Sequence, residues 1–179
     1  MAKKEQALKT NAARLLDRAK IPYRLIPYEF DENDLAAQHV ADALGEDIRK
    51  VFKTLVLHGE PSGQKGQGAG ANKGTYFVCV VPGNAEVDLK KAAAAAGMKK
   101  ADLIPMKELL PLTGYIRGGC SPIGMKKPFP TYFHTSATDF SEIYVSAGVR
   151  GLQLEISPSA LIGFVGATVA DLVKEDAGE

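Results

Sequence analysis

The chain has 179 residues, of which 45% are apolar, and its 22 basic and 21 acidic residues give a net charge of +1. A charge this close to zero excludes a protein that coats nucleic acid through bulk positive charge, although a local basic patch stays compatible with it. A chain of this length has enough core to fold without a metal or a disulfide framework. We therefore expect one domain, residues 1–179.

The two cysteines, Cys79 and Cys120, are too few for a disulfide scaffold in such a chain. The stretch "MAKKEQALKT" is polar and lacks the apolar core of a signal peptide. The sequence has no apolar run of about 18 residues, the length that a membrane span requires. These observations predict a cytoplasmic protein with free thiols and no membrane contact.

The first part of the chain contains two helical and two extended patterns. Apolar spacing predicts an amphipathic helix over residues 3–19 and a second helix over residues 35–44. The stretch "YRLIPYEF", residues 23–30, is typical of an irregular edge strand. The stretch "KVFKTLVLHG", residues 50–59, is apolar on both faces, which predicts a strand inside a sheet or in a barrel wall.

A glycine-rich polar segment, residues 59–74, is expected to be an inserted mobile loop. A phosphate-binding loop is disfavoured, because the segment has no Gly-Lys pair followed by Ser or Thr at the start of a helix. It leads instead into the strand-like run "TYFVCVV", residues 75–81. We assign this loop no role.

In the next part, Asp88 is expected to cap a helix over residues 89–97, and a short helix follows near residues 105–111. The remaining predicted elements are strands at residues 131–136, 142–148 and 152–157, a helical piece from Ser157 and Pro158, and a strand then a helix over residues 163–175. The strands do not alternate regularly with long helices. The pattern therefore favours a mixed α/β or α+β fold with a largely antiparallel, barrel-like sheet surrounded by helices.

Lys53 lies in the middle of the apolar strand. A lysine at the rim of a sheet can extend its ammonium group to water. A lysine aimed into a cleft would instead bind an anion such as phosphate, because burial of an unpaired ammonium is costly. The sequence leaves both interpretations open.

The stretch "YIRGGCSPIGMKKPFP", residues 115–130, contains paired glycines before a cysteine and a serine. Gly118 and Gly119 let a ligand approach the main chain, and successive backbone N–H groups in such a turn can bind an anion. Cys120 would be a nucleophile only with a lowered pKa and a nearby base, and no hydrolase motif surrounds Ser121. A plain tight turn is the alternative.

The three histidines, His39, His58 and His134, have no partner at ligand spacing. The sequence also lacks a C-x-x-C motif. We therefore expect no metal site.

Four blocks, in their order, resemble the YbaK family of aminoacyl-tRNA editing proteins, also called YbaK/ProX. They are an N-terminal helix followed by "IPYRLIPYEF", then "VFKTLVL", then "GYIRGGCSPIGMKK" with "PTYFH", and then "EIYVSAGVRGLQLEI". The blocks cover most of the chain, and the ordered set is specific although each block alone is weak. Within the family, the chain is most similar to the free-standing type that acts on Cys-tRNA(Pro).

The resemblance implies a mixed α/β domain with a barrel-like sheet, no metal and no organic cofactor. It implies an enzyme that clears the 3′ end of misacylated tRNA(Pro), most similar to deacylases of Cys-tRNA(Pro) and also Cys-tRNA(Cys), with prolyl-tRNA synthetase as a partner. Such editing is needed because a synthetase pocket discriminates poorly between small side chains. In this type, the thiol of the misattached cysteine attacks its own ester and leaves a cysteine thiolactone.

The resemblance also implies site residues. Lys53 matches the signature lysine, expected to contact the terminal adenosine or its phosphate, and Gly119 matches the glycine whose backbone N–H is expected to hold the reacting carbonyl. The further substrate-binding positions are Tyr28, Thr54, Gly118, Ser121, Pro122 and Ser146. Gln153 departs from the family pattern, in which an acidic residue is frequent, and this removes a charge from the pocket rim.

Two alternatives remain beside the Cys-tRNA(Pro) deacylase. One is a water-dependent Ala-tRNA(Pro) deacylase, which small residues around the pocket would allow. The other is a non-catalytic module that binds prolyl-tRNA synthetase or a nucleotide and uses Lys53 as an anion contact. Candidate contacts for the tRNA backbone are the lysine pairs Lys90 and Lys91, Lys99 and Lys100, and Lys126 and Lys127.

Overall fold

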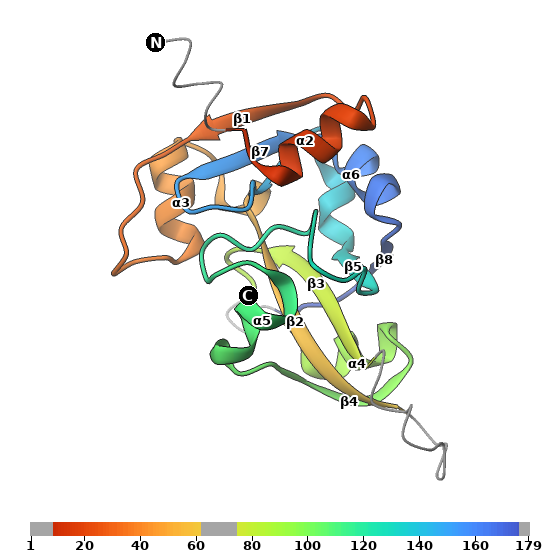
Figure 1. Cartoon of the computed structure of the whole chain (residues 1–179). Helices are drawn as coiled ribbons and strands as arrows, with labels where there is room; N and C mark the ends of the chain where they lie inside the picture. Colours follow the sequence, from red (N-terminus) through yellow and green to blue (C-terminus); the bar gives the residue numbers. More distant parts are fainter. Residues whose placement is uncertain (1–8, 62–74, 176–179) are drawn as a thin grey trace.

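The computed structural model describes residues 9–61 and 75–175 and shows a mixed α/β fold with two sheets (Figure 1). This confirms the fold class expected from the sequence. The smaller sheet has three antiparallel strands in the order β1 (Tyr23–Pro27), β7 (Leu152–Ile156) and β6 (Ile143–Ser146). Helix α2 (Asn11–Arg18) lies over this sheet and packs its buried Leu16 into the core.

The larger sheet has five strands in the order β4–β2–β3–β5–β8. Their bounds are β4 Met98–Leu103, β2 Phe52–Pro61, β3 Tyr76–Pro82, β5 Thr131–His134 and β8 Thr168–Ala170. The pairings of β2 with β3 and β4 are antiparallel, and those of β5 with β3 and β8 are parallel. The sheet is therefore mixed, with its antiparallel part around β2.

One edge of β2 is left open over a short stretch, and this gap positions the site described below. Val51, just before β2, forms an isolated bridge with Tyr144 of β6. On the same edge, β4 pairs with β2 only from Leu57 onward. The edge between these two contacts has no partner strand among the described residues, so the two sheets meet there without closing into a barrel. The expected barrel-like wall is wrong in this respect.

The core lies on both faces of β3, because alternate side chains of a strand point to opposite faces. Val78 and Val80 pack into the cluster between the two sheets, whereas Phe77, Cys79 and Val81 pack into a second cluster. The second cluster includes buried alanines of α4 (Leu89–Ala95), whose small side chains let the helix approach the sheet closely.

The other helices lie at the ends of strands. They are α3 (Ala37–Leu44), α5 (Leu109–Thr113) and α6 (Pro158–Val165), with the short 3-10 helices η1 (Ile48–Lys50), η3 (Met106–Glu108) and η4 (Thr135–Asp139). Asp88 caps α4 by accepting hydrogen bonds from two backbone N–H groups, and Ser157 caps α6 by accepting from the Ala160 N–H. The Asp88 cap and the start of a helix at Ser157 and Pro158 agree with the sequence-based expectations. Within the described residues, no helix is long and apolar enough to span a membrane.

Three sequence-based expectations were wrong in detail. The first helix of the described residues, α2, begins at Asn11, because the Thr10 side chain caps it by accepting from the Ala13 N–H. The expected helix is therefore wrong at residues 9 and 10, and its residues 3–8 lie outside the described residues. Strand β2 extends to Pro61 because β4, which was not predicted, pairs with it. Residues 62–74 of the expected loop lie outside the described residues.

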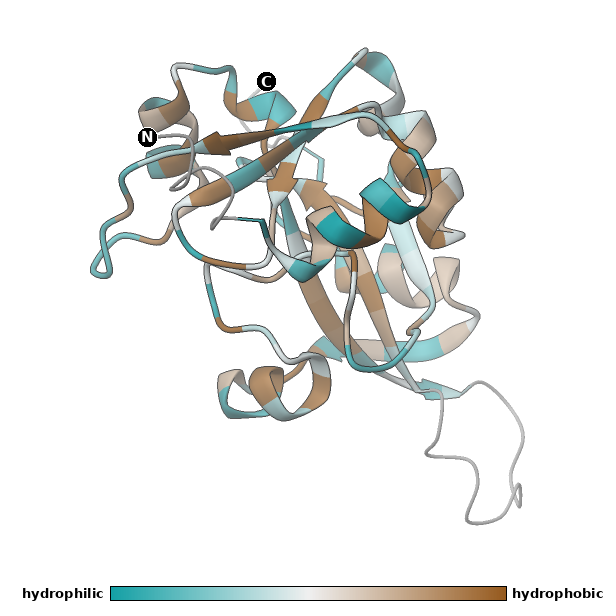
Figure 2. Ribbon diagram, turned by 45° about the horizontal axis from the view of Figure 1, so that its top comes forward, coloured by the Kyte–Doolittle hydropathy of each residue, from teal (hydrophilic) through white to brown (hydrophobic). Residues whose placement is uncertain are grey.

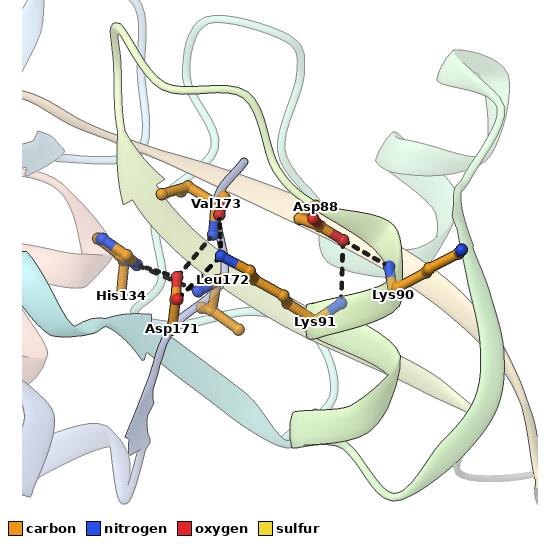
Figure 3. Close-up of polar contacts among 7 residues, drawn as sticks. All are labelled: Asp88, Lys90, Lys91, His134, Asp171, Leu172 and Val173. Carbon is orange, nitrogen blue, oxygen red and sulfur yellow. Dashed lines mark hydrogen bonds and ion pairs between the residues drawn. The ribbon is translucent and has the colours of Figure 1, made fainter. Parts of the chain in front are cut away.

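The third error concerns the segment after β8, which forms no helix up to residue 175 (Figure 3). Its backbone is held by side chains instead: the Leu172 N–H donates to His134 Nδ1 at 3.1 Å, and Lys91 Nζ donates to the Val173 carbonyl at 2.8 Å. Lys91 also forms an ion pair with Asp171 at 2.9 Å. We call these residues, His134, Lys91 and Asp171 to Val173, the C-terminal clamp.

Candidate active site

A cavity of about 560 Å3 opens at the gap along the β2 edge. One wall is β2 itself, and the other walls are the segment after β4, the start of α3 and the glycine loop. Ser146 of β6 and Gln153 of β7, which face each other in register, also line it. The cavity thus lies where the two sheets separate, and elements from both sheets hold its side chains.

Lys53 lines this cavity and is half-buried. Its ammonium has one weak contact, a 3.4 Å hydrogen bond to the Gly83 carbonyl. Burial lowers the pKa of Lys53, and the nearby carboxylate of Glu86 opposes this shift. The structure therefore decides between the two interpretations of this lysine: it is directed into a cavity and has no ion-pair partner among the described residues.

Two neutral side chains of the cavity are also unsatisfied. Thr54 Oγ1 and Gln153 Oε1 are buried atoms without a hydrogen-bond partner among the described residues, and both residues line the cavity. The Gln153 side chain as a whole is only 4% exposed. Native proteins pair nearly all buried polar atoms, so two unpaired atoms in one cavity indicate groups that await a ligand or water.

The glycine loop contributes backbone to the same cavity through Gly118, which has φ of +84° and so occupies the left-handed region. The Gly119 N–H donates to the Ile116 carbonyl at 2.9 Å and closes a turn. The flanking N–H groups of Gly118 and Cys120 have no partner among the described residues. These two groups are free donors next to the paired glycines, whereas the Gly119 N–H is not.

Gly119 is itself buried against the chain that follows β6. A Cβ atom placed on it would lie 3.2 Å from backbone atoms of both Val149 and Arg150. Arg150 Nε in turn donates to the Arg117 carbonyl at 2.8 Å, and the Tyr115 hydroxyl donates to the Ile123 carbonyl. The absence of a side chain at Gly119 therefore lets the loop pack against its neighbour.

Cys120 lines the cavity but has no property of a nucleophile. Its side chain is buried, and burial raises the pKa of the thiol to about 12. A thiolate needs a nearby cation or a helix N-terminus that lowers this pKa. At neutral pH the Cys120 thiol remains protonated.

The structure brings together only some of the residues expected at the site. Lys53, Thr54, Gly118 and Ser146 line the cavity, with Gly119 directly behind it. The remaining three do not line it: Tyr28, Ser121 and Pro122. Ser121 is fully buried and its Oγ accepts from the Ile123 N–H, while Tyr28 packs with Val40 and Tyr144.

Arg117 was missed by the sequence reasoning, and it lines the cavity. Its position directly before the paired glycines was the available signal. Lys53 and Arg117 are the only charged residues among those that line the cavity, and no carboxylate does. The described lining is therefore positive and fits an anion. Within the same ranges, no group of three or more potential metal ligands is present.

Two of the lysines considered for tRNA contact are engaged elsewhere. Lys91 belongs to the C-terminal clamp, and Lys100 forms an ion pair with Glu60 at 3.8 Å. Lys126 and Lys127 are exposed on the glycine loop. The glycine loop lines the cavity through Arg117, Gly118 and Cys120, so this last pair lies on a segment that contributes several lining residues.

Comparison with known proteins identifies the family. The model of the family described as "Aminoacyl-tRNA editing domain" matches residues 31–164, which include every residue that lines the cavity. The chain belongs to this family. The resemblance to YbaK/ProX editing proteins in the sequence is thereby confirmed.

This editing protein has relatives at two levels of similarity. A protein of Enterococcus faecalis named "Putative Cys-tRNA(Pro)/Cys-tRNA(Cys) deacylase EbsC" is 43% identical over 176 residues, 98% of this chain and 100% of that protein. A solved structure described as a "putative trans-editing enzyme for prolyl tRNA synthetase" has a TM-score of 0.73 at 22% identity, and covers 93% of this chain and 99% of that one. Another, "hypothetical protein APE2540", has a TM-score of 0.76 at 22% identity, with 90% and 97% covered. The two structures show a shared fold.

Proposed function

We propose that this protein is a trans-editing deacylase that removes misattached cysteine from tRNA(Pro), and that it also deacylates Cys-tRNA(Cys). The observation that carries the proposal is the cavity, which presents Lys53, free backbone donors and unpaired neutral atoms to one space. Family membership supports editing, and the 43% identity to a relative named as a Cys-tRNA deacylase supports the substrate. Residues 1–179 act as one editing domain in the cytoplasm, with prolyl-tRNA synthetase as a partner.

Lys53 holds the anionic end of the substrate in this proposal. A half-buried ammonium with one 3.4 Å hydrogen bond gains more from a phosphate than an exposed lysine does, because it has already lost part of its hydration. The phosphate next to the terminal adenosine is the nearest anion to the ester in an aminoacyl-tRNA. Thr54, the next residue along β2, offers its unpaired hydroxyl in the same cavity.

The glycine loop stabilises charge that develops on the ester carbonyl. The N–H groups of Gly118 and Cys120 are the free donors there, and the turn closed by the Gly119 N–H fixes their direction. Preorganised donors of this kind are worth about 3 kcal/mol each at the transition state. The family assignment of Gly119 remains a prediction, which this geometry supports through the packing of the loop rather than through its own N–H.

The reaction itself needs no nucleophile from the protein. The cysteine thiol of the substrate gives up its proton, its sulfur attacks the ester carbonyl carbon, and the bond from that carbon to the ribose oxygen breaks. The ribose regains a hydroxyl, and cysteine leaves as a thiolactone. An intramolecular attack gains effective molarity, so the cavity needs mainly to hold the ester in a reactive conformation. A protonated, buried Cys120 is compatible with this role for the substrate thiol.

The direct test is deacylation of Cys-tRNA(Pro) by the wild-type protein and by Lys53→Ala, followed together with Ser-tRNA(Pro). We expect rapid loss of the cysteinyl ester, a product that an amine nucleophile traps as the thiolactone, and no loss of the seryl ester. A spontaneous rate with wild-type protein would leave the non-catalytic binding module as the better description.

A second candidate is the water-dependent Ala-tRNA(Pro) deacylase. The observation that favours it is the pair of unpaired polar atoms, Thr54 Oγ1 and Gln153 Oε1, which could hold a water molecule in the cavity. Turnover of the alanyl ester with free alanine as the product, at a rate matching or exceeding that of the cysteinyl ester, would establish this candidate in place of the first.

A further inference from the structure

Several of the exposed large hydrophobic side chains of the described residues lie at or next to the cavity. Seven such side chains are exposed: Phe30, Leu103, Met106, Leu110, Ile116, Val149 and Val169. Leu103 and Met106 line the cavity, Leu110 and Ile116 each follow or precede a lining residue, and Val149 packs against Gly119. The seventh, Val169, lies on β8 at the far edge of the larger sheet.

Three of these side chains lie close together in the sequence, at the end of β4 and on the η3 and α5 helices that follow it. We call Leu103, Met106 and Leu110 the apolar rim; they are 50%, 57% and 52% exposed. Figure 2 shows hydrophobic residues on the short helix α5, which projects from the body of the molecule. Large apolar side chains grouped at the mouth of a cavity indicate a contact surface, whereas single ones scattered over a protein need no explanation.

The charged residues beside the apolar rim indicate the chemical class of the ligand that it binds. Lys53 and Arg117 are the charged residues of the cavity lining, and Lys107 stands exposed between two members of the rim with no ion pair among the described residues. Asp102 and Glu108 are the acidic groups of this segment, and neither lines the cavity. An apolar surface next to cations fits a single nucleic-acid strand, whose bases offer apolar faces and whose phosphates are anions.

We propose that the apolar rim is the platform for the unpaired nucleotides that precede the terminal adenosine of a tRNA, with Lys107 and Arg117 near their phosphates. The inference rests on the proposed function, because that function places the terminal adenosine and its ester inside the cavity. The strand then leaves through the mouth, and the first surface beside it is the rim. Leucine and methionine side chains cover base faces without selecting a particular base, so this contact serves the common 3′ end.

The test measures the affinity for a fluorescein-labelled RNA tetranucleotide, ACCA, by anisotropy, which needs no turnover. The double variant Met106→Ser, Leu110→Ser should bind about tenfold more weakly than the wild type, since the loss of buried apolar side-chain area costs about that much. The matched control is Val169→Ser, which removes an exposed hydrophobic side chain away from the cavity and should leave the affinity unchanged. Labelled AMP should bind the single variant Leu110→Ser and the wild type equally, because Leu110 does not line the cavity that holds the adenosine.

Equal affinity of the wild type and the double variant for ACCA would overturn the proposal, and equal weakening by Val169→Ser would do the same. Binding of prolyl-tRNA synthetase that is lost in the double variant while ACCA binding stays intact would assign the rim to a protein partner instead. The proposed deacylase activity can fail on its own, without turnover of Cys-tRNA(Pro), while the ACCA result stands. Conversely, turnover with an unaffected double variant rejects only the platform.

Discussion

The polar side chains of the C-terminal clamp have hydrogen-bond and ion-pair partners in the chain, whereas those of the cavity have few or none among the described residues. In the clamp, Lys91 has both a carboxylate and a carbonyl as partners, and His134 Nδ1 accepts from the Leu172 N–H. In the cavity, Lys53 has one weak hydrogen bond, and Thr54 and Gln153 each leave a buried oxygen unpaired. The polar groups of the clamp are satisfied within the chain, whereas these groups of the cavity remain available to a ligand.

This contrast separates stability from activity. A side chain without a partner contributes little to the free energy of unfolding, because its removal breaks no hydrogen bond and relieves a desolvation cost. A side chain with partners contributes to stability and has no reason to affect turnover. Substitutions in the two regions should therefore change different quantities.

The largest effect is expected for Lys53. Lys53→Ala should lower kcat/KM for Cys-tRNA(Pro) about a hundredfold, as loss of one preorganised charged contact does. The melting temperature should stay the same or rise slightly, because a half-buried ammonium is removed. Lys53→Arg, which retains the charge, should recover part of the activity. A loss of stability together with activity would make Lys53 a structural residue like those of the clamp.

The glycine loop allows a comparison between two adjacent residues, Gly119 and Cys120, for their effect on turnover. Gly119→Ala should reduce turnover at least about tenfold, because its Cβ would lie 3.2 Å from the backbone of Val149 and Arg150 and would displace the free donors beside it. Cys120→Ala should keep most of the activity, since its thiol is protonated. Single-turnover assays of both variants check this pair, and the reverse order of effects would return Cys120 to the role of nucleophile.

The unpaired atoms of the cavity should respond next. Thr54→Val and Gln153→Leu should each lower kcat/KM about tenfold, the equivalent of one hydrogen bond to the substrate. Neither should lower the midpoint of urea unfolding, because no partner in the chain is lost. Measurement of kcat/KM and of the midpoint of urea unfolding on the same preparations of both variants tests this prediction. Unchanged kinetics in both variants would mean that the cavity holds its substrate without these atoms.

The clamp should show the opposite result. His134→Ala removes the acceptor of the Leu172 N–H and should lower the free energy of unfolding by about 1 kcal/mol. Lys91→Met should lower the melting temperature through the loss of its contacts with Asp171 and Val173. Turnover per folded molecule should stay at the wild-type value in both. Reduced turnover with unchanged stability would place the clamp in the active site.

The smallest effect is a dependence of stability on pH through His134. Burial lowers the pKa of His134 below its ordinary value of 6.5, and Lys91 adds to this while Asp171 and Asp139 oppose it. The folded protein therefore binds fewer protons than the unfolded chain, so this contribution to stability is complete above pH 6.5 and decreases as the pH falls from 6.5 toward the lower folded value. The melting temperature should fall more between pH 7.5 and 5.5 in the wild type than in His134→Gln. Equal falls would contradict this origin.

Local patterns were sufficient for most of the elements. The apolar run of β2, the Asp88 cap of α4 and the start of α6 at Ser157 and Pro158 each depend on a few neighbouring residues, which is why the sequence predicts them. Strand β4 was missed because "MKKADL" has no apolar alternation, and only its pairing with β2 makes it a strand. The predicted final helix does not form for the same reason: side chains of the clamp, distant in sequence, bond the backbone of this segment.

The site shows the same division. By itself, the sequence determined the family through its ordered blocks, and the family resemblance predicted Lys53 and the glycine loop as parts of the site. Only the tertiary structure decided that Lys53 is directed into a cavity, that Tyr28, Ser121 and Pro122 lie outside it, and that Arg117 and the apolar rim border it. The physical reason is that the cavity lies beside the stretch of β2 between the Val51–Tyr144 bridge to β6 and the start of the β4 pairing at Leu57. In that stretch, this edge of β2 has no partner strand among the described residues. Such a gap depends on pairing between segments far apart in the chain, which no local pattern of residues records.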